Sequence, residues 1–259
     1  MKNEKTRLCL IDIVRGILII YVVYYHFMYD LNDIMGYNIP YLYSKWFSTI
    51  RDIMSGSLIF ISGISCNFSR NNIKRGARTI LVALILSIVT LVVMPEQTII
   101  FGILHLLGIM MVVYGVIQLA FDVRKREAYN DRGMSRRAVL MCIFIFLFVF
   151  SKDIYYGYVR LASVTLTLPR AFYGSFPMYI MGFAGPYASA DYYPIIPWGF
   201  LFLAGAMVGY VFKKEGLPKL LYKNFCRPLA FIGRHTMFVY IVHQPLLLGI
   251  FMLVNALKG

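Results

Sequence analysis

Residues 8–30 read LCLIDIVRGILIIYVVYYHFMYD. This run is long and apolar enough to cross a bilayer as one helix, which takes about 20 residues. It nevertheless contains Asp12, Arg15, His26 and Asp30. A charged group inside hydrocarbon costs on the order of 2.5–3.5 kcal/mol on insertion scales, so such groups are expected to face the protein interior.

Helical geometry places these four side chains on one stripe. Arg15 and His26 are eleven residues apart. This spacing places their side chains within about 20° of the same helix face and about 16 Å apart along the helix axis. Asp12 and Asp30 lie within about 40° of His26 on the same wheel. Two structural interpretations stay open, an ion pair between Asp12 and Arg15 and a histidine bonded to a backbone carbonyl. We favour a functional stripe lining a pathway, because the groups share one face of one span.

The remaining apolar blocks predict an all-α polytopic membrane helix bundle. The chain has 259 residues, 59% of them hydrophobic, against about 45–50% in a soluble domain. We expect about seven transmembrane helices in a single domain covering residues 1–259. They are expected at residues 8–29, 52–68, 77–94, 99–121, 138–151, 195–212 and 229–254. The fifth is short for a full crossing.

The net charge of +14 is explained by the expected membrane topology and does not indicate a nucleic-acid partner. Nineteen of the 26 Lys and Arg residues lie at the N-terminus or in the alternate loops 70–78, 124–137 and 213–234. This is the pattern of cytoplasmic loops. It predicts a multi-pass protein of the cell membrane with a cytoplasmic N-terminus and an external C-terminus.

Residues 152–194 are predicted to be an aromatic-rich external segment. They are too polar and too rich in Pro and Gly for a confident span, and they carry eleven Tyr and Phe residues. Such aromatics form a belt at the membrane interface, or they stack on a sugar or another flat acceptor. A hidden extra crossing in this segment would reverse the orientation of the last helix.

Two further histidines fall in predicted spans at a depth similar to that of His26. These are His105 and His243, and Pro245 after the latter frees a backbone carbonyl in its helix. Singly, each is more often a packed and satisfied side chain, but together the three could line one polar chamber. A metal site is not expected, since the histidines come from separate spans without a local ligand spacing.

Several segments resemble known membrane acyltransferases. Arg15 and His26, with ten residues between them, resemble the first-helix signature of the acyltransferase-3 type. Five segments resemble bacterial proteins similar to the catalytic domain of heparan-alpha-glucosaminide N-acetyltransferase: IDIVRG (11–16), FISGIS (60–65), FGILH (101–105), DYYPIIPW (191–198) and YIVHQP (240–245). In the lysosomal enzyme the key histidine follows the first helix. Residues 31–48 here contain none, so His26 is the candidate near that point.

The resemblance implies a transmembrane acyltransferase fold and a CoA-dependent O- or N-acyltransferase. The donor would be cytosolic acyl-CoA, with acetyl-CoA expected, and the acceptor an unidentified sugar or amine at the outer side. The expected roles are catalytic for His26 and Asp30, donor binding for Arg15, Arg70, Lys74, Arg75 and Arg78, and support for Asp12, His105, Asp191, Trp198 and His243.

His26 would act as a general base, with Asp30 fixing its tautomer, or as a nucleophile that takes the acyl group itself. The general base is favoured. Membrane lipid is an expected partner, and a homodimer stays open. Two other classes compete with the enzyme: a proton-coupled or anion transporter using the intramembrane Arg and His residues, and a non-catalytic sensor or scaffold.

Overall fold

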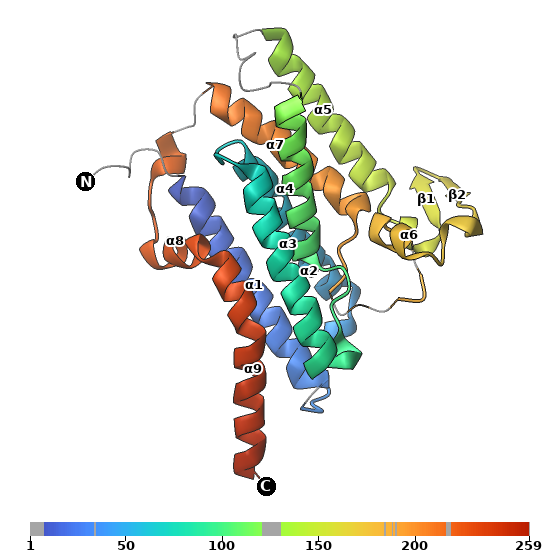
Figure 1. Cartoon of the computed structure of the whole chain (residues 1–259), viewed down its shortest axis with the longest axis vertical. Coiled ribbons are helices and arrows are strands. Elements are labelled where there is room, and N and C mark those ends of the chain that lie inside the picture. The colour runs from blue at the N-terminus through green and yellow to red at the C-terminus, as the bar shows by residue number, and fades with distance from the viewer. Residues whose placement is uncertain are drawn as a thin grey trace. The chain divides into compact units, whose positions relative to one another are not determined.

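The computed structural model describes residues 8–33, 35–120, 131–183, 185–187, 189, 191–215 and 219–258. Within these residues the protein is an all-α polytopic helix bundle, as predicted (Figure 1). Its long helices are α1 Cys9–Asp33, α2 Lys45–Cys66, α3 Asn72–Val93, α4 Ile103–Ala120, α5 Asp131–Phe150, α7 Ile195–Glu215 and α9 Thr236–Lys258. Shorter helices are α6 Phe176–Met181 and α8 Arg227–Arg234. The 3₁₀ turns are η2 Pro40–Tyr43, η3 Pro95–Gln97, η4 Ile154–Tyr156, η5 Arg170–Phe172 and η6 Lys219–Tyr222.

Six of the helices in the described part of the chain are long and apolar enough to cross a membrane. The protein is therefore a multi-pass membrane protein. The second predicted span, residues 52–68, corresponds to α2, which has 22 residues and so the necessary length, but it is not among the six. It contains Arg51 and Asp52, whose side chains form an ion pair at 2.8 Å. The predicted start at residue 52 was late, because this pair lies inside the helix.

Two predicted boundaries need larger corrections. The fifth span is not short, since a stretch of 22 residues, Ser135–Tyr156, qualifies as a crossing. Arg137 made its start look polar, yet its guanidinium lies 4.5 Å from the ring centroid of Tyr210 and is stabilised there. The predicted last helix, residues 229–254, is two helices, α8 and α9, which meet at an angle next to His235 (Figure 1).

The chain divides into two compact units, Met1–Leu58 with Leu217–Gly259, and Ile59–Gly216. In the first unit α1 packs against α8 and α9. Glycines permit the closest approach between α1 and α8. A Cβ on Gly16 would meet the carbonyl of Leu229, and one on Gly233 would meet the carbonyl of Asp12. Small residues of this kind let two backbones touch in a membrane bundle.

In the second unit α3 packs along α4 and α5 packs along α7. The second half of α2 crosses α7 backbone to backbone. A Cβ on Gly63 would meet the carbonyl of Phe202, and one on Gly205 would meet the carbonyl of Phe60. The glycine makes this approach, and the nearby Ser65 donates to the carbonyl of Ile61 within its own helix.

The described residues of segment 152–194 belong to the second unit and form a hairpin, two 3₁₀ turns and one short helix. Strands β1 Tyr158–Leu161 and β2 Val164–Thr167 form an antiparallel hairpin in which Tyr158 pairs with Thr167. The longest helix that the structure describes in this segment is α6, of six residues. The described residues of the segment therefore contain no additional membrane crossing.

Candidate functional site

The histidine predicted in the first helix meets a second histidine. His26 of α1 and His243 of α9 both belong to the first unit. Their ring centroids are 4.9 Å apart and their planes are nearly perpendicular, at 84°. His243 is buried, with 6% of its surface exposed. The long apolar faces of α1 and α9 thus enclose two imidazoles that lie 217 positions apart in the sequence.

The backbone fixes the tautomer of His243. Its Nδ1 lies 2.6 Å from the carbonyl oxygen of Tyr240. A carbonyl can only accept, so Nδ1 carries the hydrogen and Nε2 carries the lone pair. This Nε2 is enclosed and has no hydrogen-bond partner among the described residues, and the same holds for Nδ1 of His26.

Two enclosed ring nitrogens without partners are costly. A buried polar atom left unsatisfied costs about 1–3 kcal/mol, and such atoms are rare in native proteins. Polar groups inside a membrane helix bundle are typically functional. His26 and His243 each have one enclosed nitrogen that can still take part in a hydrogen bond.

Asp30 has a partner other than the one expected from the sequence. Both of its carboxylate oxygens accept hydrogen bonds from Nε2 of Gln244, at 3.1 and 3.0 Å. The structure shows no hydrogen bond between Asp30 and His26 within the residues it describes. The reason is that the His26 ring faces His243, while the long side chain of Gln244 reaches Asp30. The Asp30–Gln244 contact ties α1 to α9 beside the histidine pair.

At the other end of α1, Asp12 forms an ion pair with Arg234 of α8, at 3.6 Å. Asp12 is buried, so the pair helps to hold α8 against α1. Arg15 lies half-buried on the same unbroken helix as His26. The helical rise of about 1.5 Å per residue therefore separates Arg15 and His26 by about 16 Å along α1.

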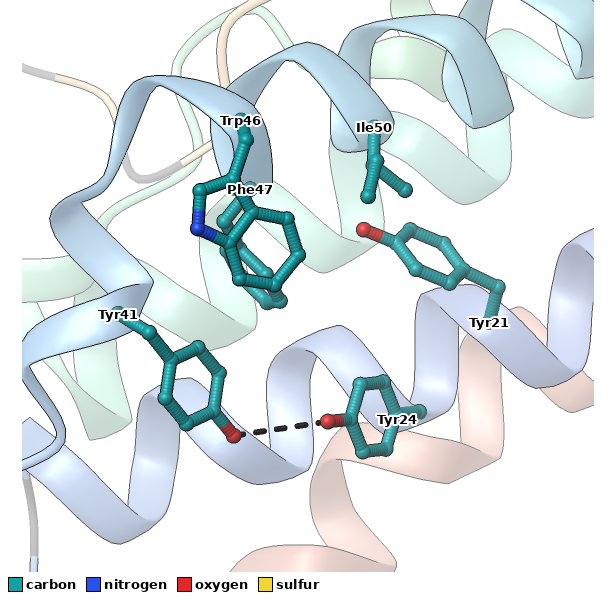
Figure 2. A pocket seen from close by; sticks show the side chains of 6 residues that line it. All are labelled: Tyr21, Tyr24, Tyr41, Trp46, Phe47 and Ile50. Atoms are coloured by element: carbon teal, nitrogen blue, oxygen red, sulfur yellow. Dashed lines mark hydrogen bonds between the residues drawn. The ribbon is translucent and has the colours of Figure 1, made fainter.

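An aromatic pocket, which the sequence did not predict, lies in the first unit. The pocket has a volume of about 400 Å³, and Figure 2 shows the six residues that line it: Tyr21, Tyr24, Tyr41, Trp46, Phe47 and Ile50. The hydroxyls of Tyr24 and Tyr41 face each other at 3.5 Å. The hydroxyl of Tyr21 is enclosed without a partner among the described residues. A ligand with one hydrogen-bonding group would satisfy it.

Stacked rings connect this pocket to the histidine pair. Phe47 stacks on Tyr25 with centroids 5.5 Å apart. Tyr25 in turn presents an edge to His26 at 5.8 Å. The only sequence signal for the pocket is the run of tyrosines within residues 21–29, which is equally compatible with a membrane helix.

His105 and Asp191, both predicted to support the site, organise the start of α4 in the second unit. Nδ1 of His105 accepts the backbone N–H of Gly102 at 3.2 Å, and its Nε2 lies 3.3 Å from Oγ of Ser87. Asp191 accepts the backbone N–H of Ile103 at 3.0 Å, as a residue at a helix N-terminus commonly does. Both nitrogens of His105 are therefore occupied by structural hydrogen bonds.

The aromatic residues of segment 152–194 pack largely on one another. Tyr179 stacks on Tyr192 at 4.4 Å, and the hydroxyl of Tyr192 donates to the carbonyl of Tyr179 at 2.6 Å. Burial raises the pKa of Tyr179 to about 12, so its phenol stays protonated at neutral pH. Trp198 packs against Phe148 and Tyr193. These contacts give this group of rings a structural role in the second unit.

The predicted donor-binding cations lie where α3 begins. Arg70, Lys74 and Arg78 are exposed and Arg75 is half-buried. The side chain of Asn71 caps the helix by accepting the N–H of Lys74 at 2.8 Å. Lys74 and Arg78 are four residues apart, so they share one side of α3, and Arg70 lies just before the helix. The arrangement presents a row of positive charge at the start of a membrane-crossing helix.

A bundle of membrane-crossing helices with two imidazoles enclosed between α1 and α9 defines an integral membrane protein with a buried polar centre. Residues 7–127 and 134–245 match the family described as heparan-alpha-glucosaminide N-acetyltransferase, catalytic. The chain belongs to this family of membrane acetyltransferases, and the resemblance seen in its sequence is confirmed. Both His26 and His243 lie within the matched residues. No curated protein and no solved structure matches the chain.

Proposed function

We propose that the protein transfers an acetyl group from acetyl-CoA to a hydroxyl or amine acceptor, with its reaction centre at His26 and His243. The observation that carries the proposal is the pair of enclosed, unpartnered ring nitrogens in a member of an acetyltransferase family. Acyl transfer from a thioester needs a base beside the acceptor, and a neutral imidazole suits that task.

Residues of the first unit can carry out the transfer. The acceptor heteroatom attacks the thioester carbonyl carbon, the carbon–sulfur bond breaks, and CoA leaves as a thiolate. His26 acts directly on these groups, either as the general base or as a nucleophile that carries the acetyl group. Gln244 and Asp30 support the centre by fixing α9 against α1.

The aromatic pocket is the proposed acceptor site. The protein that gives the family its name acts on a glucosaminide. Flat aromatic side chains such as Trp46 and Tyr41 suit a ring-shaped acceptor, and the Tyr21 hydroxyl supplies one polar contact. The ring contacts through Phe47 and Tyr25 keep this pocket next to His26.

The proposed function is tested with the purified full-length chain in lipid nanodiscs. Radiolabelled acetyl-CoA and methyl α-glucosaminide are supplied, and the acetylated sugar and free CoA thiol are both measured. Equal amounts of acetylated product and CoA are expected. The proposal would be contradicted if the protein neither bound acetyl-CoA nor transferred the acetyl group to this sugar or to any of a panel of hydroxyl and amine acceptors.

The donor phosphates are proposed to contact Arg15. Arg15→Ala is expected to weaken acetyl-CoA binding by about 10–100-fold, because a charged hydrogen bond contributes about 1.5–3 kcal/mol. Arg15→Lys should restore binding only in part, since Lys cannot form a bidentate contact. Binding is measured by isothermal titration. Arg160→Ala, in the exposed hairpin, is the control, and equal affinity in Arg15→Ala and the wild type would contradict this role.

The loops 70–78, 124–137 and 213–227 are proposed to face the cytoplasm, with the N-terminus inside and the C-terminus outside. Residues 121–130 and 216–218 lie outside the described residues. The arrangement requires α2 to cross the membrane despite Arg51 and Asp52, because without that crossing every later loop would change sides.

Cysteine labelling of intact cells tests this orientation. The four native cysteines are first replaced: Cys9, Cys66, Cys142 and Cys226. A single cysteine at position 130 should then escape a membrane-impermeant maleimide, whereas one at the exposed Tyr156 should react. Labelling at 130 without prior permeabilisation would refute the orientation, and labelling at 156 shows that the reagent works.

A further inference from the structure

We propose that His243 is a second catalytic residue and that its Nε2 takes the proton released by the acceptor. The inference rests on the proposed function and refines it, since it moves proton removal from His26 alone to a pair of imidazoles. It follows from comparing the ring nitrogens of all four histidines in the chain.

Two histidines are excluded by their surroundings. His105 uses both ring nitrogens at the start of α4. His235 has the same kind of Nδ1 contact as His243, to the carbonyl of Phe231 at 2.9 Å, but it is exposed. Only His26 and His243 have an enclosed ring nitrogen without a partner among the described residues.

Within the pair, only His243 has a nitrogen fixed as a proton acceptor. The Tyr240 carbonyl holds the hydrogen on Nδ1, which leaves the Nε2 lone pair toward the enclosed side. Nothing in the described part of the chain fixes the tautomer of His26 in this way. The same hydrogen bond to Tyr240 holds the ring of His243 in place, and the neighbouring Gln244 is bonded to Asp30 of α1. A base that is already oriented needs no reorganisation during the reaction.

The acceptor, an amine or hydroxyl, approaches the two ring nitrogens, and its lone pair forms a bond to the acetyl carbonyl carbon. Its proton passes to Nε2 of His243, while Nδ1 of His26 makes a second hydrogen bond to the same acceptor. The carbon–sulfur bond breaks with its electrons on sulfur, and the imidazolium of His243 returns the proton to give the free thiol of CoA.

The test uses two substitutions that separate the two nitrogens of His243. In His243→Asn the amide N–H stands near the original Nδ1 and can still donate to Tyr240, but no base replaces Nε2. In His243→Gln the backbone hydrogen bond is lost as well. His235→Asn and His235→Gln are the matched controls. Each purified protein is assayed for CoA release and acetyl transfer to methyl α-glucosaminide across pH, and for thermal unfolding.

Both His243 variants are expected to bind acetyl-CoA normally and to lose about 10²–10⁴ in kcat, and the fall in rate at low pH should flatten. The kcat of the double variant His26→Ala/His243→Asn should lie within a few-fold of the kcat of the slower single variant, because the two residues act as a unit. Both controls should keep wild-type turnover. Near-normal kcat and an unchanged pH profile in folded His243→Asn would overturn this inference alone. Absence of acetyl transfer by the wild type would instead overturn the proposed function beneath it.

Discussion

His26→Ala is expected to lower acetyl transfer by about 10²–10⁴, the usual loss when a positioned acid or base is removed. The protein should remain folded, because His26 forms no hydrogen bond through its enclosed Nδ1 that the truncation would break. Acetyl-CoA should still bind, since Arg15 lies about 16 Å away along α1. The measurement compares turnover and acetyl-CoA affinity in the same purified preparation.

His235→Ala provides the control for replacing a histidine, because His235 is exposed and lies at the junction of α8 and α9. Turnover of His26→Ala within a few-fold of the wild type would exclude both the base and the nucleophile at this position. Mass spectrometry of the wild type quenched during turnover separates these two roles. An acetyl group on His26 would identify the nucleophile, and its absence is expected if the histidine pair only moves the proton.

Gly63→Ala is expected to destabilise the second unit strongly, although alanine is the better helix former. The new Cβ would meet the carbonyl of Phe202, and a backbone group cannot move aside without separating α2 from α7. Overpacking of this kind costs about 1–3 kcal/mol or more, which outweighs the gain of about 1 kcal/mol in helix propensity. Thermal unfolding in detergent should show a lower midpoint for Gly63→Ala than for the wild type.

Gly249 offers a matched control in a membrane helix. A Cβ at this position meets no atom within 4 Å in the structure, so Gly249→Ala should be neutral or slightly stabilising. A wild-type midpoint for Gly63→Ala would show that α2 and α7 do not touch at this glycine. An equal decrease of the unfolding midpoint in both variants would show that the destabilisation does not depend on the contact between the helices.

The sequence alone was sufficient for the class of protein and for the relations within a single helix. The apolar runs had to be helices because a backbone in lipid must satisfy its own hydrogen bonds. Arg15 and His26 share a stripe because the helical repeat fixes their angle and their separation. The five family motifs alone indicated the acetyltransferase family, and the family match confirms it.

The relations between helices were decided only by the tertiary structure. Asp30 was expected to orient His26 and is bonded to Gln244, while Asp12 is paired with Arg234. No local periodicity encodes these partners, because they depend on how far each helix is rotated and how closely it approaches its neighbour.

That approach is set by residues distant in the sequence. Gly16 and Gly233 allow the backbones of α1 and α8 to touch, and the break beside His235 then sets the course of α9. The same packing brings His243 to 4.9 Å from His26. The sequence supplied both histidines at a similar depth, but only the packed helices show that their rings are in contact.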